Sequence, residues 1–139
     1  MSIGKGRVIF DKKFNFLASN PDGFIDDDKL VIIKSPRDCE KNSLDYHAKS
    51  DPGFCLQITE NMLQVSLTHD YYYQIQGDLH ICEKNLCYFV VSTPTEFYYQ
   101  MVPKNDRVWK EVLLDKLVHF YRYNFCNHYY LIHVSTGIV

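Results

Sequence analysis

The sequence lacks the features of a membrane, secreted or zinc-binding protein. No run of about 18 apolar residues occurs, the length that a bilayer-spanning helix requires. The chain does not open with a charged and apolar cleavable leader. Its 5 cysteines show no Cys-x-x-Cys spacing, which argues against a zinc site and favours a reducing compartment. We therefore expect a soluble intracellular protein of the nucleus or the cytoplasm.

An excess of positive charge is also missing. The chain has 15 Lys and Arg against 17 Asp and Glu, so its formal net charge is −2. Contact with DNA would have to depend on a local basic patch, because the overall field does not favour it. No Walker, GxGxxG or GxSxG pattern occurs, which leaves no support for a P-loop, dinucleotide-binding or serine-hydrolase protein. Four histidines have no ligand-like spacing: His69, His119, His128 and His133.

What is present indicates one globular domain. The 139 residues are 46% hydrophobic, and 11 Tyr and 9 Phe predict an aromatic core rim or an interaction surface. We expect strands at 6–10, 14–18, 29–34, 54–58, 62–66, 86–91 and 96–102, a short helix within 37–53, and longer helices at 68–84 and from Asn105 or Asp106 onward. This order predicts an α/β (α+β) fold with a mixed central sheet flanked by helices.

The two longer helices each carry an apolar stripe. Tyr72, Ile75, Leu79 and Cys82 form the first, and Trp109, Val112, Leu113, Leu117 and Phe120 form the second. Gln76 lies one residue beyond the first stripe, where we expect its side chain to reach a cleft. The three tyrosines at 71–73 cannot share one helix face, so packing explains them better than base stacking.

A turn and the strand that follows it carry the candidate chemistry. Asn20-Pro21-Asp22-Gly23 is a strong turn signal, and Asp26–Asp28 form the expected tip of a hairpin. Since alternate side chains of a strand share a face, Ile32 and Lys34 point the same way, and Asp22 could approach that face. A carboxylate beside a lysine at a sheet edge can hold Mg²⁺ and a water molecule. From chemistry alone, a turn and a strand-end lysine remain the simpler explanation.

Three motifs together resemble a known family. ASNPDG (18–23), LVIIKSP (30–36) and HDYYYQIQGDLHIC (69–82) occur in this order, and the run from LCYFVV to LVHFY continues the likeness over residues 6–123. The chain resembles the YqaJ-like viral recombinases, phage-type alkaline exonucleases of the PD-(D/E)XK nuclease superfamily. The resemblance implies a restriction-endonuclease-like fold for residues 1–123. The aromatic tail, 124–139, stays unassigned.

The same resemblance implies a set of site residues. Asp22 matches the metal-binding aspartate, Lys34 matches the lysine of the E-x-K strand, and the carbonyl of Ile33 would be a backbone ligand of Mg²⁺ or Mn²⁺. For the glutamine that orients water or phosphate, Gln76 is the first choice and Gln74 the second.

One departure from the family pattern decides what to expect of activity. The family reads E-I-K where this chain reads Ile32-Ile33-Lys34, and an isoleucine cannot ligate a metal. The family's N-terminal helical part, with its further acidic residue, is also absent from this sequence. Asp26–Asp28 lie about 13 Å from position 32 at ~3.3 Å per residue, too far to substitute.

Two hypotheses follow. The first is metal-dependent exonucleolytic hydrolysis of double-stranded DNA ends in recombination or repair, impaired by Ile32. The alternative is a catalytically inactive descendant that serves as a DNA-binding or protein-interaction module. A homo-oligomer is compatible with either hypothesis.

Overall fold

A computed structural model describes residues 3–126 of the chain and shows a five-stranded sheet as its centre. The strand order is β1-β4-β5-β8-β9. The bounds are Ile3–Lys5 for β1, Gly23–Ile25 for β4, Lys29–Lys34 for β5, Leu86–Ser92 for β8 and Phe97–Pro103 for β9. Strands β5 and β8 are parallel and the other pairs are antiparallel, so the sheet is mixed, as expected.

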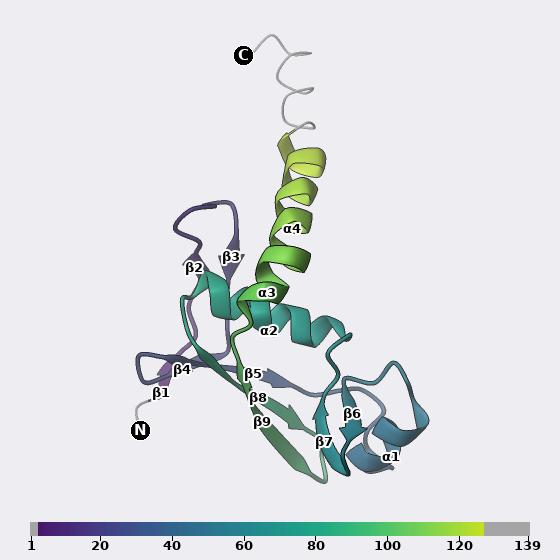
Figure 1. Cartoon of the computed structure of the whole chain (residues 1–139). Coiled ribbons are helices and arrows are strands. Elements are labelled where there is room, and N and C mark those ends of the chain that lie inside the picture. Colours follow the sequence, from purple (N-terminus) through teal and green to yellow (C-terminus); the bar gives the residue numbers. More distant parts are fainter. Residues whose placement is uncertain (1–2, 127–139) are drawn as a thin grey trace.

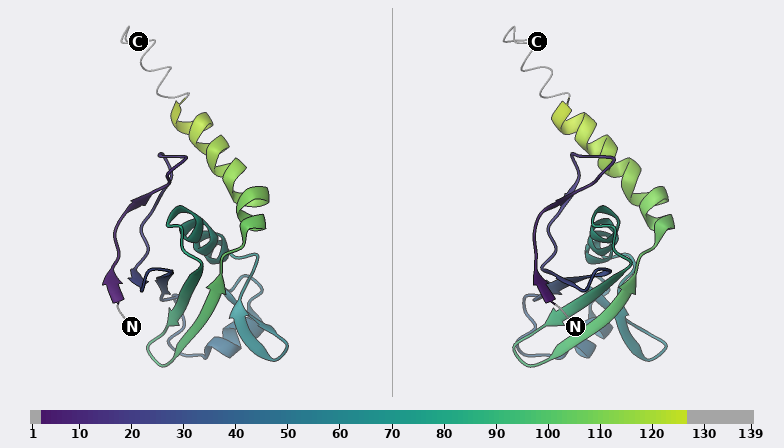
Figure 2. Two further views of the ribbon diagram at one scale, coloured as in Figure 1. Left: turned by 60° about the vertical axis from the view of Figure 1, so that its left-hand side comes forward. Right: turned by 90° about the vertical axis from the view of Figure 1, so that its left-hand side faces the viewer.

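The remaining elements surround this sheet (Figure 1). They are β2 Ile9–Phe10, β3 Ala18–Ser19, α1 Leu44–Ser50, β6 Leu56–Thr59, β7 Met62–Val65, α2 Asp70–Ile81 and a last helix from Asp106 to Cys126, which comprises α3 Asp106–Val108, a π-helical turn Trp109–Leu113, α4 Leu114–Tyr121 and a second π-helical turn Arg122–Cys126. Figure 2 shows α2 above the sheet, with the arm (residues 9–19, which carries β2 and β3) on one side and the last helix on the other.

The β4–β5 hairpin forms where the sequence predicts it. Asp26 at its tip has φ 55°, a left-handed conformation that Asp tolerates in turns. The β-branched residues of β5 then pair with both neighbouring strands, and Ile32 lies opposite Phe89 of β8. Leu30 and Ile32 are buried beneath α2, whereas Ile33 on the opposite face is 49% exposed.

Helix α2 covers one face of the sheet with its expected apolar stripe. Tyr72, Ile75, Leu79 and Cys82 are all buried, and they pack in one core with the inward side chains of β5 and β8. Ser43 and His69 cap α1 and α2, and Asn105 caps the last helix. The expected role of Phe120 in the second stripe is wrong, because its side chain is exposed.

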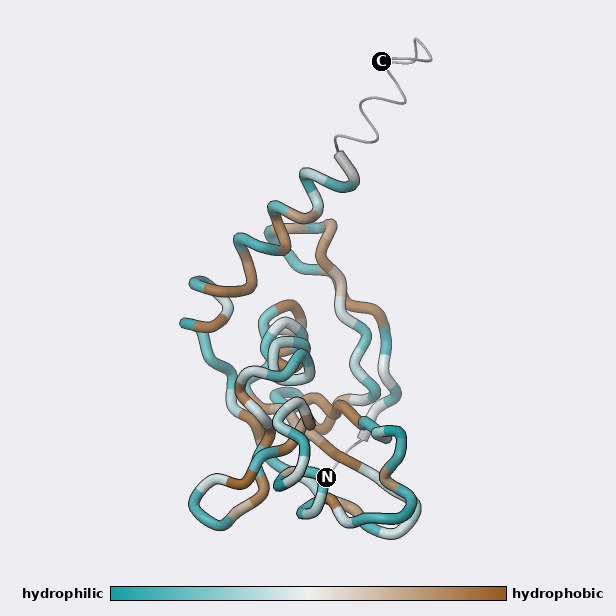
Figure 3. Tube along the Cα trace, turned by 90° about the vertical axis from the view of Figure 1, so that its right-hand side faces the viewer, coloured by the Kyte–Doolittle hydropathy of each residue, from teal (hydrophilic) through white to brown (hydrophobic). Residues whose placement is uncertain are grey.

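The opposite face of the sheet carries exposed apolar side chains in the described part of the chain. Ile33, Phe97, Tyr99 and Met101 are among the most exposed large apolar residues. Figure 3 shows hydrophobic stretches along the sheet strands and an alternation of hydrophilic and hydrophobic residues along the last helix. The helix uses its apolar side, with Leu113 and Leu117, to pack against Leu17 of the arm.

The arm departs from the expected strand at 14–18. The Asp11 carboxylate accepts hydrogen bonds from the N–H groups of Lys13 and Phe14, and the chain turns there instead of extending. Phe16 stacks on Tyr121 of α4, with ring centroids 4.0 Å apart. The arm is therefore held by its aromatic contacts with the last helix, in addition to the short β2–β3 ladder.

Two expectations concern the ends of the chain and the membrane. The expected domain boundary at residue 123 falls inside the last helix, and residues 127–139 of the tail lie outside the described residues. Between residues 3 and 126, no helix has the length and apolar character that crossing a bilayer requires.

Gly6 holds the turn that carries Asp22. A Cβ atom at position 6 would lie 2.0 Å from the carbonyl oxygen of Pro21 and 3.0 Å from that of Asp22, so the turn would have to move. We expect Gly6→Ala to lower the free energy of unfolding by about 1–3 kcal/mol in urea denaturation. The control is Gly77→Ala in α2, where a Cβ meets nothing within 4 Å. It should stabilise the protein by up to roughly 1 kcal/mol. Equal stability of the two variants would contradict this account of the turn.

Candidate active site

The carboxylate of Asp22 is fixed to the adjacent strand. Asp22 lies directly before β4, and its N–H donates to the carbonyl of Val31 at 3.0 Å. Its Oδ2 accepts a hydrogen bond from the N–H of Ile33 at 2.7 Å. The side chain thus extends the β4–β5 ladder by one hydrogen bond beyond Gly23, the first residue of β4. This contact places a carboxylate beside residue 33 of β5.

The carbonyl of Ile33 lies on the same side of β5 as Asp22. Val31 and Ile33 both bond toward Asp22, and a strand residue directs its N–H and its C=O to the same neighbour. Because β4 begins only at Gly23, no β4 residue continues the ladder there. The Ile33 carbonyl and the Asp22 carboxylate are therefore two oxygen donors beside each other at the end of β5.

Lys34 follows directly and points toward α2. Its Nζ lies 4.7 Å from the centroid of the Tyr71 ring, a cation–π contact with the first turn of the helix. The Asp22 carboxylate thus bonds the residue that directly precedes Lys34 in β5. Ile32 shares the α2-facing side with Lys34 but is only 1% exposed. Its side chain belongs to the core beneath α2.

Gln76 does not reach a cleft, so that expectation is wrong. The side chain is fully buried, at 0% exposure. Its amide nitrogen donates to the carbonyl of Pro103 at 3.0 Å, and its amide oxygen accepts from the N–H of Asn105 at 2.7 Å. Both polar ends are engaged by the backbone that joins β9 to the last helix. Gln76 therefore connects α2 to that segment.

Gln74, the second choice, lies on the other side of α2 and is exposed. Its side chain hydrogen-bonds the carboxylate of Asp78, one helical turn further on. Both residues line a cavity of about 260 Å³ between α2 and the last helix. Ser19 of β3 also donates to the Oδ1 of Asp78, at 2.7 Å. A buried carboxylate that the sequence analysis did not single out thus joins the site.

The charge of Asp78 depends on several of the predicted site residues. Burial raises the pKa of its carboxyl group, while the hydrogen bonds from Ser19 and Gln74 lower it. The ammonium of Lys34 also lowers the pKa of Asp78, and the nearby carboxylate of Asp22 raises it. Lys34 and Asp22 are thus close enough to Asp78 to act on its charge.

The donor set suits a hard divalent cation. Within residues 3–126, no three Asp, Glu, His or Cys side chains gather as a ligand set by themselves. Mg²⁺, however, needs only one or two carboxylates, since water and substrate oxygens complete its octahedron. Asp22 and the Ile33 carbonyl would hold such an ion, and all the oxygen donors are hard ligands of the kind that it prefers.

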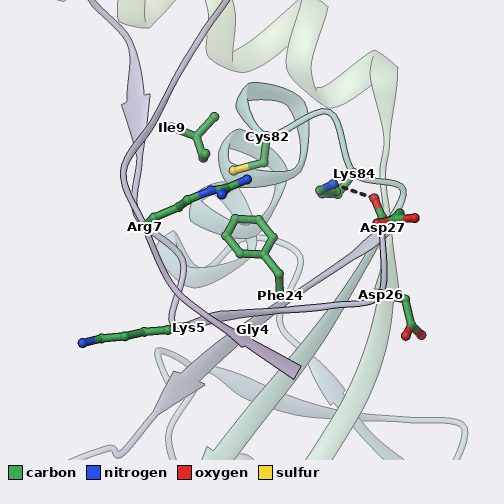
Figure 4. Close-up of a pocket in the computed structure, with 9 residues that line it drawn as sticks. All are labelled: Gly4, Lys5, Arg7, Ile9, Phe24, Asp26, Asp27, Cys82 and Lys84. Carbon is green, nitrogen blue, oxygen red and sulfur yellow. Dashed lines mark hydrogen bonds between the residues drawn. The ribbon is translucent and has the colours of Figure 1, made fainter. Parts of the chain in front are cut away.

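A second, basic cavity lies at the opposite end of α2 (Figure 4). Its volume is about 250 Å³. Arg7 and Lys84 reach toward Phe24 from two sides, with Cζ and Nζ 5.9 and 5.8 Å from the ring centroid. Lys84 also donates to the carbonyl of Asp27 at 2.5 Å. Lys5 and Asp26 line the rim and extend away from the ring.

Comparison with known proteins agrees with this architecture. No family model and no curated protein sequence matches the chain. Among solved structures, the alkaline exonuclease LHK-Exo of Laribacter hongkongensis superimposes with a TM-score of 0.72 at 15% identity, over 99% of this chain and 64% of that one. The same figures hold for the complex of LHK-Exo with dAMP. The likeness shows the fold, and it confirms the restriction-endonuclease-like sheet flanked by helices. The chain spans about 64% of the length of that neighbour.

Substitution of the two glutamines should show which of them stabilises the fold. Gln76→Leu leaves the Pro103 carbonyl and the Asn105 N–H without their partner, so we expect a loss of about 2–3 kcal/mol in the free energy of unfolding. Gln74→Leu, the matched change on the exposed side, removes one of the two hydrogen bonds that Asp78 accepts and should cost less, about 1 kcal/mol. Urea denaturation of both variants measures this difference. A larger loss of unfolding free energy for Gln74→Leu than for Gln76→Leu would contradict the structural role of Gln76.

Proposed function

We propose that this domain acts on DNA as an exonuclease of the YqaJ-like type. It would hydrolyse phosphodiester bonds at double-stranded ends with Mg²⁺ or Mn²⁺, in recombination or repair, at a rate lowered by Ile32. The observation that carries the proposal is the placement of the Asp22 carboxylate, the Ile33 carbonyl and Lys34 together at the end of β5. The fold shared with an alkaline exonuclease supports it.

Each residue has a role that its position supports. Asp22 and the Ile33 carbonyl would hold the ion, which supplies positive charge beside the phosphate undergoing attack. Lys34 would orient the attacking water and interact with the developing negative charge. Its contact with the Tyr71 ring restricts the side chain without neutralising it. Gln74 would orient water or a phosphate oxygen from the exposed side of α2.

Ile32 explains why we expect reduced activity. A carboxylate at this position would share a strand face with Lys34, whereas the isoleucine is buried among apolar residues. Removing one carboxylate from a magnesium site weakens the attraction for the ion and for its ordered waters. The same observation supports the second candidate function, a DNA-binding or protein-interaction domain without cleavage. A homo-oligomer and a nuclear or cytoplasmic location stay predictions.

The basic cavity supports contact with the DNA backbone away from the cleavage point. Arg7 and Lys84 present two cations beside an aromatic ring. From Asp22 to Asp26 is about 13 Å along β4, a distance of about four base pairs at ~3.4 Å each. A duplex that enters the site could therefore place a backbone phosphate at this cavity. The protein would then bind DNA through a local patch in spite of its net charge of −2.

Cleavage should depend on Asp22. We expect Asp22→Asn to reduce digestion of linear duplex DNA in Mg²⁺ or Mn²⁺ by at least about 100-fold, because it removes the charge that attracts the ion. The amide oxygen of Asn can still accept from Ile33, so the fold should be kept. Asp45→Asn on the exposed first turn of α1 serves as the matched control. Full activity of Asp22→Asn would exclude this site, and binding of duplex DNA without any digestion by the unmodified protein would favour the second candidate function.

The basic cavity is tested by binding. We expect Arg7→Gln to weaken duplex binding and to reduce the slope of log affinity against log salt by about 0.9, the value for one lost phosphate contact. Arg107→Gln changes the net charge equally, at an arginine that pairs with Glu111 on the last helix. It should leave the slope unchanged. Fluorescence anisotropy at several salt concentrations measures both variants, and equal slopes for the two would remove the cavity from the DNA interface.

A further inference from the structure

Asp78 is the one buried carboxylate in the described part of the chain. Its residue exposure is 9%, and the other buried polar residues among residues 3–126 are Ser19, Ser66 and Gln76, none of them ionisable. Burying a carboxylate is costly unless hydrogen bonds or charges compensate it. A neutral asparagine at this position could keep the bond with Ser19. The acid therefore calls for an explanation beyond packing.

We propose that Asp78 supplies the second carboxylate of the divalent-cation site, from α2 instead of from β5. The proposal rests on the proposed function and deepens it. The strand position next to Lys34 holds Ile32, which has no ligand atom. The missing negative charge would come from the helix that lies over the same face of the sheet.

The geometry of α2 places Asp78 on the side that faces the site. Tyr71, which contacts Lys34, precedes Asp78 by seven residues, or two helical turns, and lies on the same face. Gln74 occupies the turn between them and hydrogen-bonds Asp78. One side of α2 thus carries an aromatic ring against the lysine and, further along the helix, an amide and a carboxylate that hydrogen-bond each other.

The chain that leads to Asp22 brings the two acids together. Ser19 donates to the Oδ1 of Asp78 at 2.7 Å and precedes Asp22 by three residues. Cys82, one turn beyond Asp78, bonds Ser19 as well, at 3.4 Å, which fixes β3 against the helix. Asp22 is in turn fixed to Ile33. The carboxylate of Asp22 and the ammonium of Lys34 both act on the charge of Asp78, so the two acids belong to one electrostatic neighbourhood.

An ion between these groups would have a suitable set of oxygen donors. The Asp22 carboxylate, the Ile33 carbonyl and the Asp78 carboxylate are three hard donors, and water molecules would complete the octahedron. Ser19 and Gln74 would orient the Asp78 carboxylate, as hydrogen bonds to ligating groups do in metal sites. The ion would also offset the repulsion between the two carboxylates and the cost of burying Asp78.

Binding of Mn²⁺ to the full chain without DNA tests the proposal directly. Electron paramagnetic resonance counts free Mn²⁺ in titrations of the unmodified protein, Asp78→Asn and the control Asp70→Asn, an exposed acid at the first turn of α2. We expect Asp78→Asn to weaken Mn²⁺ binding at least about tenfold, while circular dichroism and Tm show a folded protein. Asp70→Asn should match the unmodified protein. An affinity of Asp78→Asn within twofold of the unmodified protein would overturn the proposal.

A second comparison asks whether Asp78 and position 32 do the same job. Ile32→Glu combined with Asp78→Asn should recover Mn²⁺ affinity, whereas Ile32→Gln combined with Asp78→Asn should not. If Ile32→Glu strengthens binding by the same factor with and without Asp78→Asn, the two positions act independently and the proposal fails. Because Ile32 is buried, melting curves with and without Mn²⁺ verify folding. If the Ile32 variants do not fold, the Asp78→Asn titration decides alone.

The outcomes also separate this inference from the proposed function. Loss of DNA digestion in Asp22→Asn, with unchanged Mn²⁺ binding and digestion in Asp78→Asn, would retain the nuclease and remove Asp78 from its metal site. The unmodified protein could instead bind Mn²⁺ through Asp22 and Asp78 and fail to digest DNA. That result would support the ion site and contradict the proposed nuclease activity.

Discussion

One hydrogen bond, from the N–H of Ile33 to the carboxylate of Asp22, fixes the position of the candidate site. It forms just before β4 begins, opposite the part of β5 that has no β4 partner, so a side chain takes the place of a strand residue. The bond fixes the carboxylate beside the Ile33 carbonyl, one residue before Lys34. Gly6 packs against the same turn so closely that no Cβ atom fits. The backbone of three segments thus holds one acid at the end of one strand.

Helix α2 connects this site to the rest of the molecule through two opposite faces. On one, Gln76 bonds the segment between β9 and the last helix, and His80 stacks on Trp109 with ring centroids 5.0 Å apart. On the other, Tyr71 contacts Lys34, and Asp78 bonds Gln74 and Ser19 of the arm. The first face stabilises the fold. The second face carries the buried carboxylate of Asp78, whose ionised form burial disfavours. A functional role for Asp78 would explain why an acid is found there.

Local patterns were enough to predict most of the fold. The hairpin after Asp22, the buried stripe of α2 and the β8–β9 pair follow from turn residues and apolar periodicity. The glutamine choice failed because neighbouring helix residues differ by about 100° in direction, and only the path of the chain near Pro103 decides which glutamine is buried. Strand β1 gave no signal, since its three residues become a strand only by pairing with β4. The sequence did contain a pattern that points to Asp78. It lies between Ile75 and Leu79 of the buried stripe and one helical turn after Gln74.

The central claim is that a divalent cation binds between the Asp22 carboxylate and the Ile33 carbonyl. A crystal of the protein grown with Mn²⁺ tests it most directly, through the anomalous scattering of the metal. The account predicts one strong anomalous peak about 2.0–2.3 Å from an oxygen of Asp22 and from the Ile33 carbonyl, at the end of β5. A peak only at other acids, such as Asp26–Asp28 at the far end of the hairpin, or no peak at all at saturating Mn²⁺, would contradict it.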